Sequence, residues 1–337
     1  MKASLLRQCK AAEEYPLSVE DFPVPTLASG QVLVEVRACG VCRSNLHMVE
    51  GDWIATGVPA KFPIIPGHEI VGRVVKLGNN VDILQEGDRV GIQPLWSACG
   101  RCEFCLTGRE QLCQSKKITG ETVDGGYAEY VVANSEHVYP LPDNLKDSEA
   151  APLFCPGITA YSAVKKAELQ PGKRVAVLGV GGVGHMVIQF GRLSGADVVA
   201  VSGGEQHLRL ARELGASEVV DIREGDQEQW LRKIGPVDSS IVFAPSAPLT
   251  ELAIRATKPG GTTVIGVSTV LGQWLFFNEK RVVGTVTGSR NDMREVLRIA
   301  GTGRIKAVCD EYRLGMANDV LRMLKAGQIR ARAVLVP

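Results

Sequence analysis

The sequence predicts an α/β protein with a β-rich, barrel-like first half and a doubly wound parallel sheet in its second half. The first half holds short strand-like runs separated by Gly, Pro, Asn and Asp, and no long helical pattern interrupts them. From Gly172 onward, strand-like and helical patterns alternate. A glycine-rich turn at residues 179–184 joins a β-branched run to a segment with helical spacing.

Size and composition narrow the range of functions. The 337 residues are enough for two domains with separate cores, and 45% hydrophobic with 22% charged residues is ordinary for a globular protein. A net charge of +1 offers no basic footprint for nucleic acid and no polybasic membrane patch. The N-terminus lacks an apolar region of signal-peptide length, and no run approaches the ~20 apolar residues of a membrane span. We therefore expect a cytoplasmic protein that binds neither nucleic acid nor membrane, and whose nine cysteines are reduced.

Four strand-like runs are expected in the first half. Residues 31–38 alternate apolar and polar side chains, as a half-buried strand does. The other runs are residues 70–77, 89–92 and 127–132, each bounded by turn-forming residues. Together they favour a barrel-like β domain over a parallel sheet.

Four clustered cysteines follow the third of these runs with the spacing C-x2-C-x2-C-x7-C. They are Cys99, Cys102, Cys105 and Cys113. Four thiolates this close in sequence can close a tetrahedral site around zinc, which orders a lobe that has little apolar core. An iron–sulfur cluster or two disulfides are the alternatives. A reducing compartment disfavours disulfides and no Cys-Pro ending suggests a ferredoxin run, so we expect a structural zinc.

A second group of metal-ligand residue types is dispersed along the chain. Its members are Cys39, Cys42, His47, His68, Glu69 and Cys155. His68 and Cys155 lie beside Pro-Gly pairs, in loops where ligands from separate elements can converge. Two thiolates plus one imidazole would leave a fourth zinc position open, as in a catalytic site. Alternatively, Cys39 and Cys42 could form a redox pair, although no thioredoxin-like βαβ pattern surrounds them.

The glycine-rich turn is a candidate binding site for a dinucleotide. Gly179, Gly181 and Gly184 match G-x-G-x-x-G, with Gly182 and Val183 between them. Glycines allow a sharp turn and close approach to a pyrophosphate, and the following helix offers unpaired N–H groups to the anion. A glycine-rich turn without a ligand is the alternative.

The second half contains six strand-like runs, a number that suits a doubly wound sheet. These are residues 175–178, 198–201, 219–220, 241–243, 263–267 and 282–285. Helical spacing appears at residues 205–214 and 292–300, and residues 333–336 read as a final strand. At the end of the second run, Ser202 occupies the place where an acidic residue normally accepts from the ribose 2′-OH of NAD.

The order of these motifs resembles that of zinc-dependent medium-chain alcohol dehydrogenases, nearly from end to end. The motifs are Cys42-Arg43-Ser44-Asn45-Leu46-His47, Gly67-His68-Glu69, the four-cysteine lobe, Cys155-Pro156-Gly157-Ile158-Thr159-Ala160-Tyr161 and the glycine turn. The chain is most similar to the tetrameric microbial and yeast branch, given its length and the segment Ser202-Gly203-Gly204-Glu205. The resemblance implies a GroES-like barrel domain and a Rossmann domain, and a homotetramer or homodimer.

The resemblance also implies site residues and domain boundaries. Cys42, His68 and Cys155 would hold a catalytic zinc, with Cys39 a bystander and Glu69 behind the metal as an outer carboxylate or occasional ligand. The GroES-like catalytic domain would comprise residues 1–153 and 291–337, with the structural zinc lobe at about 95–115, and the Rossmann domain residues 154–290. Two zinc ions per chain are therefore expected.

By the same resemblance, Ser44 and His47 would relay the alcohol proton, and Arg43 and Arg332 would bind the cofactor phosphates, with Arg330 an alternative to Arg332. The family usually has Asp after the relay Ser or Thr, where it orients the zinc-bound histidine; this chain has Asn45. We expect the Asn45 carbonyl to accept the imidazole N–H without charge, which leaves the ligand less basic.

Cofactor and substrate class follow from the same comparison. Ser202 removes both the 2′-OH partner of NAD and the repulsion of a 2′-phosphate, so we favour NADP and keep NAD open. The implied reaction interconverts alcohols and aldehydes or ketones by hydride transfer with NAD(P). Trp53 would wall the pocket. Pro94 aligns with a second pocket aromatic of that branch, and Trp96 is shifted from it by two residues, which favours bulkier or aromatic alcohols; the alternative is that Trp53 and Trp96 pack in the core.

Rival functions remain at this stage. A polyol or threonine dehydrogenase of the same superfamily is one, although the polyol branch tends to place Glu where this chain has Cys155. A non-catalytic zinc-binding protein derived from a dehydrogenase is the other.

Overall fold

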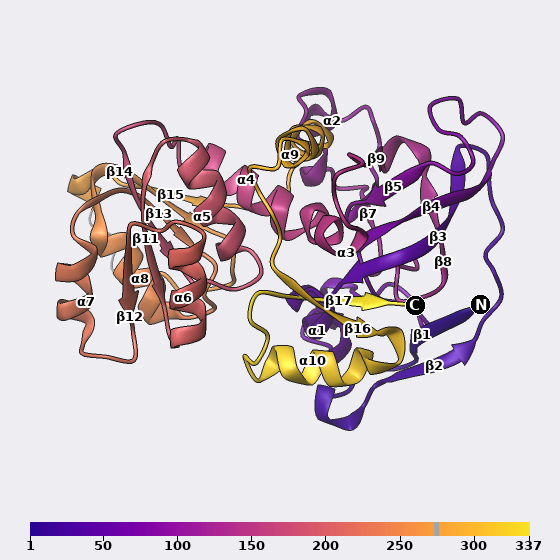
Figure 1. Ribbon diagram of the computed structural model, residues 1–337, viewed down its shortest axis with the longest axis horizontal. Helices are drawn as coiled ribbons and strands as arrows, with labels where there is room; N and C mark the ends of the chain where they lie inside the picture. The colour runs from indigo at the N-terminus through magenta and orange to yellow at the C-terminus, as the bar shows by residue number, and fades with distance from the viewer. Residues whose placement is uncertain (273–275) are drawn as a thin grey trace. The chain divides into compact units, whose positions relative to one another are not determined.

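The chain divides into two units in the computed structural model, which describes residues 1–272 and 276–337 (Figure 1). The first unit comprises Met1–Cys155, Ser289–Gly303 and Ala307–Pro337. The second comprises Pro156–Gly288 and Arg304–Lys306. The first unit is discontinuous because the chain leaves it after Cys155 and returns to it at Ser289. Among the described residues, no helix is long and apolar enough to cross a membrane.

A seven-stranded mixed sheet forms the frame of the first unit, in the order β16-β17-β3-β4-β5-β9, with β8 also paired to β3. All of its pairings are antiparallel except that of β16 with β17. The strands are β3 (Gln31–Gly40), β4 (Glu69–Leu77), β5 (Arg89–Ile92), β8 (Tyr130–Asn134), β9 (Val138–Pro140), β16 (Cys309–Arg313) and β17 (Arg332–Val336). The final strand of the chain thus pairs with β3, the strand that leads to Cys42.

Three of the four strands expected in this half lie where the sequence predicts them, and the fourth begins later. Tyr130 starts β8, whereas the preceding residues pair with the N-terminal strand instead: Ser4 N–H donates to Tyr127 C=O, and Glu129 N–H donates to Lys2 C=O. That detour places the buried Tyr127 ring beside Gly67, next to the expected ligand His68.

The rest of the first unit consists of short elements around this sheet (Figure 1). Its other strands are β1 (Lys2–Leu6), β2 (Leu17–Asp21), β6 (Leu95–Ser97) and β7 (Lys117–Ile118). Its helices are α1 (Arg43–Glu50), α2 (Glu103–Leu106), α3 (Asp147–Ala150), α9 (Arg290–Gly301) and α10 (Ala317–Lys325). Its 3-10 turns are η1 (Ala12–Glu14), η2 (Ile54–Thr56), η3 (Glu110–Leu112), η4 (Ser135–His137), η5 (Ala151–Phe154) and η7 (Leu314–Met316). The strand-rich reading of this half missed α1, which is too short to show clear helical periodicity.

The second unit is a six-stranded parallel sheet in the order β12-β11-β10-β13-β14-β15. Its strands are β10 (Arg174–Leu178), β11 (Asp197–Ser202), β12 (Glu218–Asp221), β13 (Val237–Val242), β14 (Thr257–Ile265) and β15 (Arg281–Gly284). Its helical elements are α4 (Pro156–Lys166), α5 (Gly184–Leu193), α6 (Glu205–Glu213), α7 (Gln227–Ile234), α8 (Ala247–Ala256) and η6 (Phe276–Asn278). This strand order confirms the predicted doubly wound sheet, in which ligands bind at the carboxyl ends of the strands where the order reverses, beside β10.

Candidate metal centres and cofactor turn

Three side chains from separate elements of the first unit converge as the sequence predicts. Cys42 caps the start of α1, His68 precedes β4, and Cys155 follows η5. The Sγ atoms of Cys42 and Cys155 lie 3.7 Å apart. Zinc with Zn–S bonds near 2.3 Å and tetrahedral angles would hold two sulfurs roughly 3.8 Å apart, so this pair fits a shared metal. Cys39 is fully buried outside the cluster, and burial raises the pKa of its thiol.

The cluster is protected and poised to bind a cation. One ligand atom each from Cys42, His68, Glu69 and Cys155 lies within 4.8 Å of the others. The Cys155 side chain, which hydrogen-bonds with Cys42, holds the pKa of the Cys42 thiol well below its usual range, although burial opposes this shift. A thiolate in a buried site needs a compensating positive charge. The donor set therefore fits zinc.

Glu69 lies among these ligands but is already paired. Arg332 Nε donates to Glu69 Oε2 at 3.0 Å, and Arg332 Nη2 donates to Oε1. Glu69 is fully buried and Arg332 is 5% exposed. A Cβ atom at Gly40 would lie 2.0 Å from Glu69 Oε2, so only glycine leaves room for this carboxylate. Glu69 therefore suits the expected role of a carboxylate behind the metal. Arg332 donates two of its five N–H groups to this carboxylate.

Helix α1 carries the expected relay residues on neighbouring turns. Ser44 Oγ lies 3.4 Å from His68 Nε2, on the inner side of the helix. His47 lies three residues further on, and its Nδ1 pairs with Asp52 Oδ2 at 2.6 Å. Its side chain is 37% exposed, and its ring lies 5.3 Å from the ring of Trp53. The helix therefore extends from the cluster of Cys42, His68 and Cys155 to solvent. Arg43, the first helical residue, is exposed.

Asn45 does not take the role that the sequence suggests for it. Its Oδ1 accepts from Cys42 N–H at 3.0 Å and from Tyr127 O–H at 3.2 Å. The expected bond from the imidazole N–H of His68 to this oxygen is absent among the described residues. The reason is local, because Asn45 is the third residue of α1 and closes a capping box on Cys42.

The four-cysteine lobe also has the arrangement of a closed metal site. Ligand atoms of Cys99, Cys102, Cys105 and Cys113 lie within 4.8 Å of one another. The Cys99–Cys105 and Cys102–Cys105 sulfurs are 3.9 and 3.5 Å apart, and all four cysteines are free thiols. Backbone N–H groups of Arg101 and Cys102 lower the pKa of Cys99 to about 6. The two disulfides considered above are wrong, since a disulfide needs sulfurs about 2 Å apart.

Removing one ligand of this lobe tests its structural role. We expect Cys105→Ala to lose one zinc ion per chain and to lower Tm by roughly 10 °C, because a metal that replaces a core contributes several kcal/mol. Activity at low temperature persists, because the cluster of Cys42, His68 and Cys155 shares no residue with the lobe. Metal analysis and calorimetry measure both effects; an unchanged Tm would show that the lobe needs no metal.

The glycine turn has the backbone that dinucleotide binding requires. Gly179 adopts φ +96°, a conformation that other residues rarely take. A Cβ atom at Gly184 would lie 1.8 Å from Gly179 C=O, so the start of α5 packs directly on the turn. A Cβ atom at Gly181 would meet open space, on the side where a pyrophosphate could approach. Gly182 and Val183 complete the turn, and Val183 is the cap of α5.

Beside Ser202, the structure brings in a basic residue that the sequence reading missed. Ser202 ends β11 and pairs in register with Asp221 at the end of β12. Arg223 follows β12, and its side chain lies along the Gly203-Gly204 turn, within 3.6 Å of where a Gly203 Cβ would be. Arg223 binds Asp221 through Nε and Nη2, and this pairing lowers the pKa of the Asp221 carboxyl to about 2. The signal in sequence was Arg223 itself, just after the third strand.

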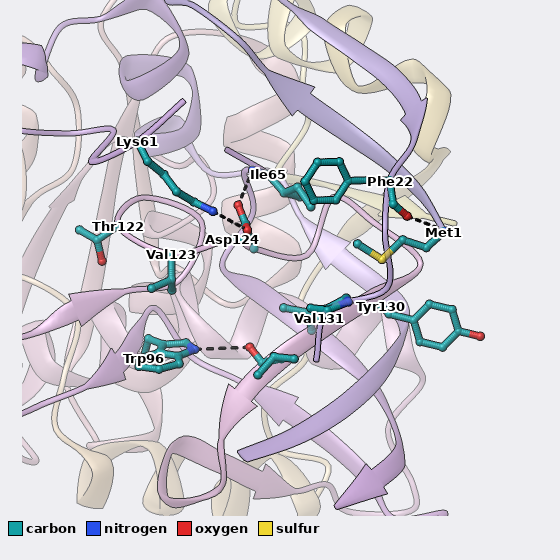
Figure 2. Close-up of a pocket in the computed structure, with 13 residues that line it drawn as sticks. Met1, Phe22, Lys61, Ile65, Trp96, Thr122, Val123, Asp124, Tyr130 and Val131 are labelled. Carbon is teal, nitrogen blue, oxygen red and sulfur yellow. Dashed lines mark hydrogen bonds and ion pairs between the residues drawn. The ribbon is translucent and has the colours of Figure 1, made fainter. Parts of the chain in front are cut away.

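Of the aromatic residues considered for a substrate pocket, Trp53 lies beside the relay histidine and Trp96 lies elsewhere. Trp96 lines a pocket of about 320 Å³ with Met1, Phe22, Thr122 and Tyr130 (Figure 2). None of the expected catalytic-zinc ligands lines this pocket. Pro94 is buried, and its C=O accepts from Thr119 N–H at 2.8 Å.

Family models match both halves of the chain. The model of the alcohol dehydrogenase GroES-like domain matches residues 28–143, and that of the zinc-binding dehydrogenase matches residues 182–301. Between them they span more than half of the sequence, and each match falls in the half where the sequence predicts a domain of that kind.

Known proteins are similar over the full length. An alcohol dehydrogenase of Geobacillus stearothermophilus is 41% identical over 347 residues, 99% of each chain. The structure of an alcohol dehydrogenase from the archaeon Aeropyrum pernix superposes with a TM-score of 0.92 at 32% identity, covering 100% of both chains. A structure described as an NAD-dependent alcohol dehydrogenase has the same TM-score, 30% identity and the same coverage. With the convergent thiolates and imidazole, these likenesses show that the chain belongs to the zinc-dependent medium-chain alcohol dehydrogenase family.

Proposed function

We propose that this alcohol dehydrogenase interconverts primary alcohols, including bulky or aromatic ones, with their carbonyl compounds, using NADP in preference to NAD. The convergence of Cys42, His68 and Cys155 beside Ser44 carries the proposal. The polyol and threonine branches and a non-catalytic role are not favoured by the relatives, which are named alcohol dehydrogenases. Pro94 in place of a pocket aromatic supports the bulkier substrates.

Each residue of the site has a chemical task. A bound zinc would supply Lewis-acid chemistry that makes the alcohol proton easier to remove, and a bound nicotinamide would supply the hydride acceptor. Cys42, His68 and Cys155 would hold the metal and leave one position for substrate oxygen. Ser44 Oγ would accept the hydroxyl proton, and His47 would pass it to solvent, with Asp52 fixing the imidazole. Glu69, neutralised by Arg332, limits the negative charge behind the metal.

Four further features complete the proposal. Cys99, Cys102, Cys105 and Cys113 would hold a second, structural zinc, since they form a separate ligand set. Arg43, with Arg332 or Arg330, would bind the cofactor phosphates by resemblance. The nine cysteines, all of which lie in the described part of the chain and none of which forms a disulfide, suit the reducing cytoplasm. A homotetramer or homodimer follows from the resemblance to the microbial branch.

The preference for NADP rests on Ser202 and Arg223 together. Ser202 presents no carboxylate to repel a 2′-phosphate. Asp221 takes up two N–H groups of the Arg223 side chain, which leaves three for an anion at the Gly203-Gly204 turn. The negative charge of the Asp221 carboxylate would repel the 2′-phosphate, but the Arg223 guanidinium neutralises that charge. One structural neighbour is described as NAD-dependent, so the two cofactors must be compared directly.

This function can be tested by initial rates of the zinc-loaded protein. The rates are measured with a panel of aliphatic and aromatic aldehydes, each with NADH and with NADPH. We expect reduction with both cofactors, a higher kcat/KM with NADPH, and retained rates for the aromatic members. Rates with neither cofactor would refute the enzyme assignment, and a clear NADH preference would refute the NADP proposal alone.

Removing the positive charge of Arg223 tests the preference for NADPH over NADH more directly. We expect Arg223→Ala to raise KM for NADPH about 10- to 100-fold, because a charge-assisted hydrogen bond contributes roughly 1.5–3 kcal/mol. KM for NADH should change less than about twofold, since NADH has no 2′-phosphate. Arg212→Ala, on α6 and paired with Glu205, is the matched control and should alter neither constant. Equal losses for both cofactors would remove Arg223 from the specificity site.

A further inference from the structure

The ligand histidine His68 has a ring nitrogen that still needs an acceptor. Its Nε2 faces Ser44 Oγ at 3.4 Å, whereas its Nδ1 faces a different loop, so Nε2 is the nitrogen placed to bind the metal. Its Nδ1 is buried and makes no hydrogen bond to residues 1–272 or 276–337. When one imidazole nitrogen binds a cation, the other carries the proton and needs an acceptor, which fixes the ring and raises the basicity of the ligand.

Asn45 cannot supply this acceptor. Both lone pairs of its Oδ1 are used by Cys42 N–H and Tyr127 O–H. The amide cannot be turned over, because its NH2 group would then face the Cys42 N–H. What remains is Nδ2, which is buried without a partner among the described residues and is itself a donor. Two donors cannot satisfy each other, so position 45 leaves the imidazole N–H unpaired.

A carboxylate from another loop is the nearest candidate acceptor. Glu121 Oε1 lies 3.7 Å from His68 Nδ1, a little beyond direct hydrogen-bond distance. The two side chains are 14% and 3% exposed, so water screens this contact little. This is the one ion pair that Glu121 makes within the described part of the chain. A small rotation of either side chain would complete the hydrogen bond.

The backbone holds the Glu121 loop against the ligand segment. Gly125 N–H donates to Ile65 C=O at 2.7 Å, and Gly126 N–H donates to Gly67 C=O at 2.9 Å. A Cβ atom at Gly120 would lie 2.6 Å from Gly67 C=O, so the two segments touch through their main chains. The approach of Glu121 to His68 is therefore set by the fold on both sides of the carboxylate.

We propose that Glu121 is the positioning residue for the zinc ligand His68, and that it replaces the carboxylate that the family usually has at position 45. It accepts the Nδ1 proton, fixes Nε2 toward the metal and keeps the imidazole basic. The inference rests on the proposed catalytic zinc. It corrects the expectation that this ligand is less basic for lack of a carboxylate partner.

Zinc release measures this role directly. Zinc release from the zinc-loaded enzyme is followed with excess chelator and a colorimetric indicator. The Cys42→Ser variant should lack the phase of release that comes from the catalytic site, and so identifies that phase. We expect Glu121→Gln to speed that phase by about 10- to 100-fold, the usual effect of losing a carboxylate behind a metal-bound histidine, and Glu121→Asp to speed it less. The matched control is Asp124→Asn, in the same loop and paired with Lys61 (Figure 2), which should leave it unchanged.

A spectroscopic signature separates positioning from loop packing. In ¹⁵N-histidine-labelled, zinc-loaded protein, which has five histidines, the Nδ1–H proton of His68 should resonate far downfield and move upfield in Glu121→Gln. Unchanged release and an unchanged resonance would overturn the inference, as would equal acceleration by Asp124→Asn. Absence of the catalytic phase from the unmodified protein would instead refute the proposed catalytic zinc.

Discussion

Replacing Cys155 with alanine is expected to lower the metal content from the proposed two zinc ions per chain to about one and to reduce turnover by at least ~10³-fold. The Sγ atoms of Cys155 and Cys42 lie 3.7 Å apart. Glu69 cannot take the place of Cys155 as a ligand, because its carboxylate is held by Arg332. The Lewis acid supplies several kcal/mol of transition-state stabilisation, and each ~1.4 kcal/mol is tenfold in rate. Metal analysis and steady-state rates on the same preparations provide the test.

Cys39 offers a matched control for this experiment. It is fully buried three residues before Cys42 but lies outside the ligand cluster, so Cys39→Ala should keep both metals and most of the activity. The same pair of variants also tests the redox alternative, in which Cys39 and Cys42 act together. If Cys39→Ala were inactive and Cys155→Ala active, the redox reading would stand and the zinc assignment would fall.

The sheet of the second unit could be predicted because its signal is local. Runs such as Val175–Leu178 are apolar along their length, as strands buried on both faces must be, and Gly179 needs its unusual φ in any such turn. The clustering of Cys42, His68 and Cys155 was also predictable, since His68 and Cys155 lie beside Pro-Gly pairs in loops, where side chains from separate elements can converge. Helix α1 was not predicted, because eight residues hold too few turns for a periodicity to stand out.

Partners between distant loops could not be predicted in this way. The role of Asn45 depends on the Tyr127 hydroxyl and on the Cys42 amide, and a sequence pattern fixes neither. Glu121 and Arg223 likewise gain meaning only from what the fold brings beside them, His68 in one case and the Gly203-Gly204 turn in the other. Sequence therefore identified the side chains that cluster, whereas the groups proposed to act on them could be recognised only from three-dimensional contacts.

The second large effect is expected at Ser44, whose hydroxyl lies 3.4 Å from His68 Nε2. We expect Ser44→Ala to lower kcat by roughly 10²- to 10³-fold, as the loss of a positioned proton acceptor does, while zinc content stays unchanged. The substitution removes no backbone bond of α1, since the capping box of that helix uses Cys42 and Asn45. Steady-state kinetics with metal analysis separates this result from the loss of zinc expected for Cys155→Ala.

Ser44→Thr serves as the control for the proton acceptor, because it keeps the hydroxyl and adds only a methyl group. It should retain turnover within about tenfold of the unmodified enzyme, since a methyl group in a pocket alters binding by roughly 1 kcal/mol. If both variants lost activity equally, crowding or altered packing near His68 would explain the result better than proton transfer. If Ser44→Ala kept near-normal turnover, Ser44 would have no place in the relay, and water at the mouth of the site would have to receive the proton. The role of the hydroxyl can thus be separated from that of the metal by experiment. Ser44→Ala is expected to remove the proton acceptor with zinc in place, whereas Cys155→Ala is expected to remove zinc with the proton acceptor intact.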